Sequence, residues 1–174
     1  MIEEPTLYQK RVPRVLVLTP TRELAAQVGE TILSLGKDLG VRSAVVFGGV
    51  GITPQKAAIA KGLDFLVATP GRLLDLMNQG FAGLSKTHIL ILDEADRMLD
   101  MGFLPDLKRI LKALPPDRQT LLFSATFSPE IKKLASEFLN KPESVEIERN
   151  KDSSLVRQTL YRVPKANKHT VLRD

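Results

Sequence analysis

Residues 89–96 read Ile-Leu-Ile-Leu-Asp-Glu-Ala-Asp, and this stretch decides the fold class of the chain. Its four apolar residues are continuous rather than alternating with polar ones, which is typical of a strand buried on both faces of a parallel sheet. Similar runs occur at 15–18, 44–47, 65–68 and 121–123. Because the sequence between the runs has helical character, we predict an α/β domain with a parallel sheet and helices on both faces.

The starts of several helices are marked by hydroxyl side chains. Proline directly follows Thr53, Thr69 and Ser128, and an acidic residue lies two positions after Thr21. A hydroxyl N-cap followed by proline or an acidic residue in the first turn is a common helix start. We therefore expect helices to begin at these residues.

Polar or glycine-rich stretches follow each of the apolar runs. They are 19–23, 48–49, 69–72, 93–96 and 124–126. All strands of a parallel sheet end on the same edge, and that edge is where ligands bind in such folds. We expect the functional residues to gather there.

Asp93 and Glu94 place two carboxylates at the end of the most apolar strand. Phosphoryl chemistry uses such a pair, in which one carboxylate holds Mg²⁺ through its waters and the other orients and deprotonates the attacking water. The alternative is that Asp93 only caps a short helix over 95–99.

Ser124 and Thr126 end another buried strand at the same predicted edge. Small hydroxyl groups there can hydrogen-bond Asp96 or detect a nearby phosphate. The alternative is an ordinary loop.

Three further stretches are suited to phosphate groups. Thr69-Pro70-Gly71-Arg72 provides a helix N-terminus with free N–H groups and a positive charge, and Thr21-Arg22-Glu23 repeats this arrangement. Gly48-Gly49 leaves backbone N–H groups uncovered. Each has a plain alternative, such as a capped helix or an Arg22–Glu23 pair, but independent accidents would not all fall at the ends of parallel strands.

In order and spacing these stretches resemble the first-lobe motifs of DEAD-box ATP-dependent RNA helicases, over about Val12 to Glu148. The most specific match is 93–103, Asp-Glu-Ala-Asp-Arg-Met-Leu-Asp-Met-Gly-Phe, and the general texture is similar to the bacterial branch. The matching stretches are Pro20-Thr21-Arg22-Glu23-Leu24, Gly48-Gly49, Thr69-Pro70-Gly71-Arg72, Asp93-Glu94-Ala95-Asp96 and Ser124-Ala125-Thr126.

The resemblance implies a role for each matching residue. Asp93 would hold Mg²⁺ through water, Glu94 would act on the hydrolytic water, and Asp96 with Ser124 and Thr126 would link the ATP state to closure of the lobes. The residues that would contact the RNA sugar-phosphate backbone are Pro20, Thr21, Arg22, Gly49, Thr69, Gly71 and Arg72. Such contacts are independent of RNA sequence.

The chain departs from the family in having no P-loop. That motif needs Gly-x-x-x-x-Gly-Lys-Ser/Thr, whereas the one Gly-Lys pair, Gly36-Lys37, is followed by Asp38. We therefore expect an incomplete RecA-like P-loop NTPase lobe that lacks the P-loop strand. ATP and Mg²⁺ would be cofactors of the full-length parent, and we expect the isolated chain to be inactive.

The expected domain organisation has three parts. Residues 1–12 would be a leader remnant, 13–148 a partial first RecA-like lobe, and 149–174 a linker with the start of the second helicase lobe. The polar stretch 149–154, Arg-Asn-Lys-Asp-Ser-Ser, lacks apolar periodicity and indicates the linker.

The composition excludes several classes of protein. There is no cysteine, the two histidines, His88 and His169, are far apart in sequence, and no apolar run is long enough for a membrane span. A net charge of +5 is a mild bias toward polyanions, and the 2 Tyr and 0 Trp disfavour a base-stacking platform. We expect a cytoplasmic protein that contacts the sugar-phosphate backbone of RNA.

Two questions stay open at this point. The chain is either part of an ATP-driven RNA remodelling enzyme or a non-catalytic fragment that binds RNA or a protein partner. In addition, the missing P-loop strand would leave residues 120–123 as an uncharged sheet edge, through which the chain could self-associate.

Overall fold

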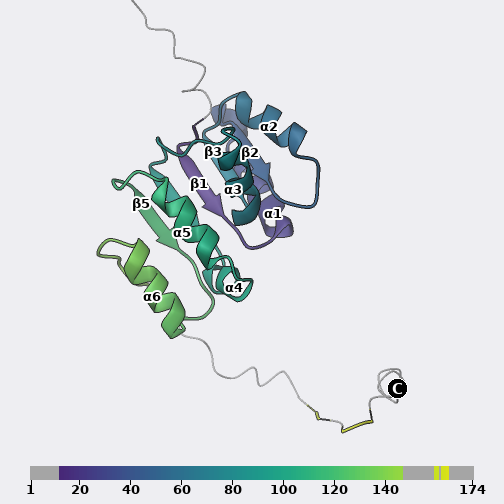
Figure 1. Ribbon diagram of the computed structural model, residues 1–174, viewed down its shortest axis with the longest axis vertical. Helices are drawn as coiled ribbons and strands as arrows, with labels where there is room; N and C mark the ends of the chain where they lie inside the picture. The colour runs from purple at the N-terminus through teal and green to yellow at the C-terminus, as the bar shows by residue number, and fades with distance from the viewer. Residues whose placement is uncertain (1–11, 147–158, 161, 165–174) are drawn as a thin grey trace, which may run out of the picture. The chain divides into compact units, whose positions relative to one another are not determined.

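The computed structural model describes residues 12–146, 159, 160 and 162–164 (Figure 1). The chain divides into two units, Met1–Lys141 and Pro142–Asp174, and the described helices and strands all lie in the first. The expected leader, 1–12, and the expected linker with the second-lobe segment, 149–174, fall almost wholly outside the described residues. The proposed domain boundaries therefore stay predictions.

A five-stranded parallel sheet forms the centre of the first unit, in the order β2-β3-β1-β4-β5. This confirms the predicted parallel α/β fold. β2 begins one residue and β5 two residues before the apolar runs predicted at 44–47 and 121–123. The strands are β1 Val15–Leu18, β2 Ser43–Val46, β3 Phe65–Ala68, β4 Ile89–Leu92 and β5 Gln119–Leu122.

The strands end level with one another. Leu18 of β1 is paired in register with Ala68 of β3 and with Leu92 of β4. Val46 pairs with Ala68, and Leu122 with Leu92. The residues that follow the strands therefore emerge at one level along a single edge of the sheet.

Within the described residues, five α-helices and a short 3-10 helix connect the strands, and a sixth α-helix follows β5. Thr21, Thr69 and Ser128 are N-caps as predicted, although only Thr21 and Ser128 accept a capping hydrogen bond. The N-cap expected at Thr53 is wrong, because the N-cap of α2 is Gly51, two residues earlier, and Ile52 packs against the core. The helices are α1 Arg22–Leu35, η2 Lys37–Leu39, α2 Ile52–Ala60, α3 Pro70–Asn78, α4 Ala95–Asp100, α5 Leu104–Lys112 and α6 Pro129–Phe138.

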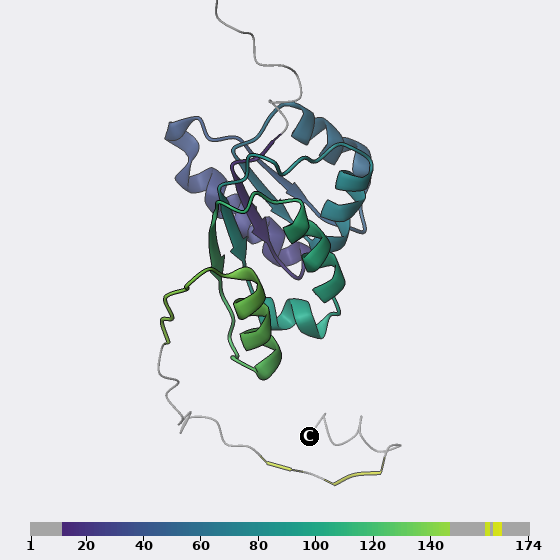
Figure 2. The same ribbon diagram turned by 60° about the vertical axis from the view of Figure 1, so that its left-hand side comes forward.

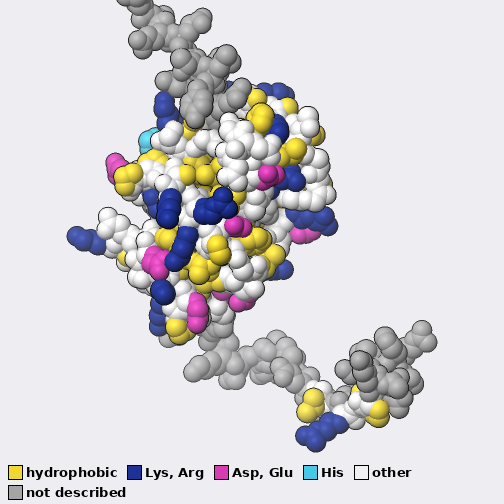
Figure 3. Space-filling model, viewed as in Figure 1, with side chains coloured by type: hydrophobic (Ala, Val, Ile, Leu, Met, Phe, Trp, Pro, Cys, Tyr) yellow, Lys and Arg dark blue, Asp and Glu magenta, His cyan; other side chains and the backbone are white. Residues whose placement is uncertain are grey.

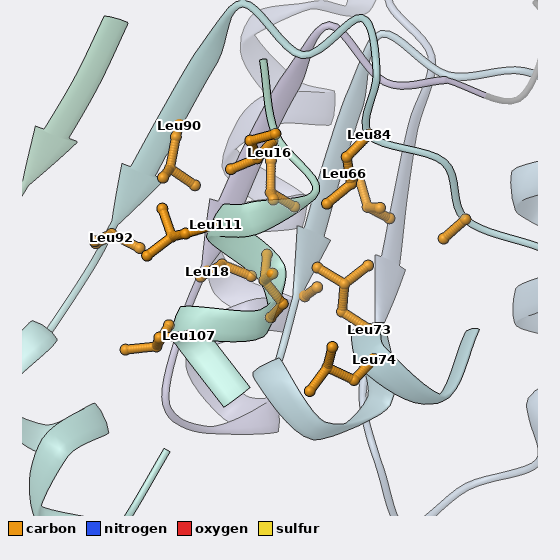
Figure 4. Packing of buried hydrophobic residues seen from close by; sticks show 14 of the residues in the cluster. Leu16, Leu18, Leu66, Leu73, Leu74, Leu84, Leu90, Leu92, Leu107 and Leu111 are labelled. Atoms are coloured by element: carbon orange, nitrogen blue, oxygen red, sulfur yellow. The ribbon is translucent and has the colours of Figure 1, made fainter. Parts of the chain in front are cut away.

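The main core lies between one face of the sheet and helices α2 to α6 (Figure 2). Figure 4 shows leucines of the strands, such as Leu16 and Leu92, facing Leu73 of α3 and Leu107 of α5. All four are fully buried. Burying a leucine contributes roughly 1.5 to 3 kcal/mol, so this layer stabilises the sheet.

Helix α1 packs on the opposite face of the sheet, over Val15, Val17 and Val67. It approaches closely because a Cβ on Gly29 would collide with the side chain of Val45. Helices therefore cover both faces, as predicted, although α1 alone packs on this one within the described residues.

Strand β5 is an edge strand, which confirms that prediction for the described residues. It pairs only with β4 in that part of the chain. The following residues are partly apolar and open to solvent, since Phe123 is 52% and Phe127 46% exposed. Among the described residues, no strand covers this edge.

Among the described residues, none of the helices combines the length and the apolar character that a membrane span requires.

Candidate functional site

All the motifs predicted from the sequence lie along the edge where the strands end. The strand order separates them into two groups. The acidic half comprises 93–96 and 124–126, which follow the neighbouring strands β4 and β5. The glycine half comprises 19–23, 48–51 and 69–72, which follow β1, β2 and β3.

Asp93 is partly buried at the end of β4. Burial raises the pKa of its carboxyl group, and the negative charge of Glu94 raises it further. The Glu94 N–H donates a hydrogen bond to Asp93 Oδ1 at 3.0 Å, which lowers the pKa but does not cancel the rise. The N-cap of α4 is Glu94 rather than Asp93, so capping does not explain Asp93. A carboxylate whose charge is disfavoured by burial is suited to a nearby cation.

Glu94 has an unusual backbone conformation. Its φ of 49° and ψ of 52° lie in the left-handed region, which residues other than glycine seldom adopt. Its side chain is 42% exposed, and Glu94 Oε2 lies 3.3 Å from Arg97 Nη1. The strained turn directs the carboxylate away from the core, and such strain is concentrated at functional sites.

Asp96 joins α4 to the segment after β5. Asp96 Oδ2 accepts hydrogen bonds from Thr126 N–H at 2.9 Å and Thr126 Oγ1 at 2.8 Å, which confirms the expected contact. Burial raises the pKa of Asp96, but hydrogen bonds from Thr126, the Arg97 N–H and Ser124 outweigh it and lower the pKa overall. The Ser124 hydroxyl also donates to Thr126 O at 2.7 Å. Asp96 therefore links the start of α4 to the residues after β5 through these hydrogen bonds.

In the glycine half, Arg22 lies at the exposed start of α1. Its Nε lies 2.6 Å from Glu23 Oε1, and both side chains are more than 60% exposed, at 62% and 64%. The alternative that Arg22 only pairs with Glu23 therefore occurs in the structure. An exposed ion pair of this kind contributes only about 0 to 1 kcal/mol, so Arg22 can leave Glu23 and bind another anion. Thr21 caps α1 through its Oγ1, and Pro20 is buried.

The Gly48–Gly51 loop lies beside Arg22 and Arg72. A Cβ built on Gly49 would lie 3.8 Å from Arg22 Nη1, and Gly49 has a φ of 81°. Arg72 Nη2 donates to Val50 O at 3.0 Å, while Arg72 Nε lies 4.0 Å from Asp75 Oδ2. The Arg72 side chain is only 12% exposed, so it is far more enclosed than Arg22.

Helix α3 begins at an open surface. Gly71 is exposed, and a Cβ built there meets no described atom within 4 Å. The described contacts therefore do not require glycine at this position, although a ligand close to the backbone would. Thr69, the N-cap, is buried and makes no side-chain capping bond.

Gln55 is a polar residue of the glycine half that the sequence reasoning missed. It is 8% exposed, and its Nε2 donates to Phe47 O at 3.1 Å and to Gly51 O at 3.3 Å. A glutamine one turn into a helix has no local signal of its own. Its place a few residues after Gly48-Gly49 is the one hint that the sequence offers.

Within the described residues, no group of three or more His, Cys, Asp and Glu forms a metal site. Mg²⁺ bound with nucleotide phosphates keeps several waters and uses only one or two protein carboxylates. Asp93, partly desolvated and with Glu94 beside it, fits that pattern.

The sequence matches the family model "DEAD/DEAH box helicase" over residues 2–134. The ATP-dependent RNA helicase dbp2 of Aspergillus clavatus is 47% identical over 79% of the chain, and the ATP-dependent RNA helicase RhlB of Xanthomonas axonopodis pv. citri is 43% identical over 92%. The chain spans only 25% and 29% of these two relatives. Because fungal and bacterial relatives are similarly close, identity alone does not assign the branch.

Solved structures show the same fold. A DEAD box protein from Methanococcus jannaschii has a TM-score of 0.71 and 44% identity, covering 74% of this chain and 35% of that one. The yeast DEAD-box splicing factor Prp28 has a TM-score of 0.74 and 32% identity, and the match covers 80% of this chain and 34% of that one. The parallel sheet and its helices are thus those of a RecA-like helicase lobe, and the chain belongs to the DEAD/DEAH box helicase family.

Proposed function

We propose that this chain is part of an ATP-dependent RNA helicase, in which the acidic half of the edge serves ATP hydrolysis and the glycine half holds RNA. The observation that supports this most directly is the shared edge, where the two halves end at one level of the sheet. Relatives named as ATP-dependent RNA helicases support the same assignment.

In the acidic half, Asp93 would hold Mg²⁺ through water, and Glu94 would orient and deprotonate the attacking water. The metal, when bound with ATP, would neutralise charge that develops on the phosphates. The exposed carboxylate of Glu94, bonded only to Arg97 among the described residues, is open to water. Asp96, Ser124 and Thr126 would transmit the ATP state to closure of the second lobe.

In the glycine half, the RNA backbone would lie across the ends of β1, β2 and β3. Free N–H groups at the starts of α1 and α3 attract phosphates, and the glycines permit close approach. The residues proposed to contact the sugar-phosphate backbone are Pro20, Thr21, Arg22, Gly49, Thr69, Gly71 and Arg72. The contacts involve no base edges, so binding would be independent of sequence.

Overall charge contributes little to this proposal. Figure 3 shows Lys and Arg side chains on the face that carries α3 and α5, where they lie among acidic and apolar ones. The net charge of +5 thus does not form a basic patch on that face. We attribute RNA binding to the edge rather than to a general positive surface.

ATP binding requires phosphate-cradling groups that this sequence does not contain. We expect the 174-residue chain alone neither to bind ATP tightly nor to hydrolyse it. A non-catalytic RNA- or partner-binding role is the second candidate, since the N–H groups of 48–51 donate to no described acceptor and can bind a ligand without ATP hydrolysis. For either role we propose a cytoplasmic location.

RNA binding is the part of the proposal that can be tested with the isolated chain. Fluorescence anisotropy would compare two single-stranded RNAs of equal length and unrelated sequence, over a range of salt concentrations. We expect equal affinities and equal salt slopes for the two. A strong preference for one sequence, or no binding of either at low salt, would contradict the proposal.

We also propose that β5 allows the chain to self-associate. Its outer N–H and C=O groups are unpaired within the described residues, and Phe123 beside it is 52% exposed. Exposed apolar edges of this kind favour pairing with another strand.

A further inference from the structure

The Gly48–Gly51 loop is held by hydrogen bonds rather than by packing. All four of its residues are exposed, and a Cβ built on Gly48 meets no described atom within 4 Å. Three glycines in four residues give the backbone wide conformational freedom, which has to be restricted before the loop can bind a ligand well.

Gln55 holds both ends of this loop. Its side-chain amide donates to Phe47 O, just before the loop, and to Gly51 O, its last residue. The orientation of the amide is unambiguous, because only the NH₂ group can donate to two carbonyl oxygens. The side chain is 8% exposed, so the clamp lies beneath the surface.

Arg72 holds the middle of the loop from α3, through its hydrogen bond to Val50 O at 3.0 Å. The carbonyl groups of Phe47, Val50 and Gly51 are therefore all occupied by side chains. In contrast, the N–H groups of 48–51 donate to no described acceptor. A loop in which the carbonyls of Val50 and Gly51 are bonded and the N–H groups are free presents donors, which is the polarity that a phosphate requires.

The Oε1 atom of Gln55 is buried without a partner among the described residues. An unpaired buried acceptor costs stability, and an apolar residue of similar shape would avoid that cost. What glutamine provides here, and an apolar residue of the same shape would not, is the pair of hydrogen bonds that it donates to the loop.

We propose that Gln55 is a positioning residue for RNA: by holding the carbonyls of Phe47 and Gly51, it keeps the N–H groups of 48–51 free for a phosphate. The inference rests on the proposed function of the glycine half. Gln55 itself would touch no RNA, so its loss would lower affinity without removing a charged contact.

The test compares Gln55→Met with Gln79→Met in the whole chain. Methionine keeps the shape and removes the donor, and Gln79 is an exposed glutamine at the far end of α3, bonded to Asp75 at 2.9 Å. Anisotropy with oligouridine RNA gives affinity and salt slope, and ¹⁵N relaxation gives the backbone order of 48–51.

For Gln55→Met we expect about tenfold weaker binding, because two hydrogen bonds that order the loop are lost, with an unchanged salt slope. Order parameters in the loop should fall from about 0.85 toward 0.6. The melting temperature should fall by roughly 4 to 8 °C, because two hydrogen bonds are lost, and Gln79→Met should match the wild type throughout. If Gln55→Met does not fold, the shorter neutral variant Gln55→Asn, which cannot reach both carbonyls, takes its place.

The outcomes separate this inference from the proposed function. If the wild-type chain binds no RNA, the proposed function fails and the inference fails with it, even where relaxation shows that Gln55 orders the loop. If the wild type binds RNA and Gln55→Met binds equally well, the positioning role is wrong while the proposed function stands. A lowered salt slope, or equal weakening by Gln79→Met, would also overturn the positioning role.

Discussion

The two halves of the sheet edge are held in different ways. In the acidic half, side chains bond to one another across neighbouring segments, as Asp96 does with Thr126. In the glycine half, the side chains of Gln55 and Arg72 bond to backbone carbonyls and leave backbone N–H groups free. The acidic half is therefore sensitive to the charge of single residues, and the glycine half to the shape of a loop.

The largest effect is expected from Glu94→Gln in a protein that contains this lobe together with a P-loop. Hydrolysis should fall by roughly 10²- to 10⁴-fold, because the residue acts on water as a general base. Nucleotide binding should stay unchanged, and Glu30→Gln on α1 is the matched control. A radiolabelled ATPase assay with parallel nucleotide-binding titrations checks this, and equal loss of binding and turnover would mean that Glu94 is structural.

A smaller effect is expected from the arginines of the glycine half. Arg22→Ala should weaken all single-stranded RNAs alike and lower the salt slope by roughly 0.7. Arg72→Ala should lower the slope equally but weaken binding further, because Val50 O also loses its donor. Arg72→Lys keeps the charge and loses the fixed hydrogen-bond geometry, so it should reduce affinity with little change in slope.

Anisotropy titrations at several salt concentrations measure both quantities. A variant that altered sequence preference and kept its salt dependence would show that these arginines read bases.

Substitutions of Asp93 and Asp96 should shift the melting temperature in opposite directions, by only a few degrees. The pKa of Asp96 is lowered by folding, so its stabilisation is present above the unfolded value near 3.9 and is lost as pH falls through the folded value. The pKa of Asp93 is raised by folding. Its contribution to the free energy of unfolding is therefore most favourable at low pH and is lost as pH rises through its pKa in the folded protein.

Thermal melting of the chain tests this contrast. At pH 7, Asp96→Asn should lower the melting temperature by about 2 °C, and Asp93→Asn should raise it slightly. Asparagine can still accept the Glu94 N–H, so Asp93→Asn removes only the partly buried charge. Both differences should shrink near pH 3, and equal shifts of the same sign at pH 7 would contradict the assigned pKa directions.

The weakest expected effect concerns β5, which borders the acidic half. We expect the chain to self-associate at high concentration, and Leu121→Lys to reduce the association by placing a charge on the edge. Light scattering over a dilution series measures this, with Leu39→Lys as a control at a residue that is 78% exposed. A wild-type monomer at high concentration, with slowly exchanging Leu121 and Leu122 amides, would show that something else covers the edge.

Much of the fold could be predicted from the sequence, because buried parallel strands require continuous apolar runs such as 89–92. The edge on which the motifs lie followed from the parallel order of the strands. The start of α2 could not be predicted, because the packing of Ile52 against the core overrides the local capping signal of Thr53.

The details of the site were harder to predict than its location. The hydrogen bond between Asp96 and Thr126 was one of the alternatives that the sequence predicted, since both residues follow neighbouring strands. The left-handed conformation of Glu94 and the two contacts of Gln55 depend on tertiary structure, for which the local sequence has no pattern. The contact of Arg72 with Val50 O likewise joins residues that are 22 positions apart.

The central claim is that one sheet edge is divided into an RNA half and a nucleotide half. A two-dimensional NMR titration of the ¹⁵N-labelled chain with a short single-stranded RNA tests it most directly. We predict that amide shifts are concentrated at 21–23, 48–51 and 71–72, with little change at 93–96 and 124–126. Shifts spread equally over both halves, or gathered on α5 and α6, would contradict the division.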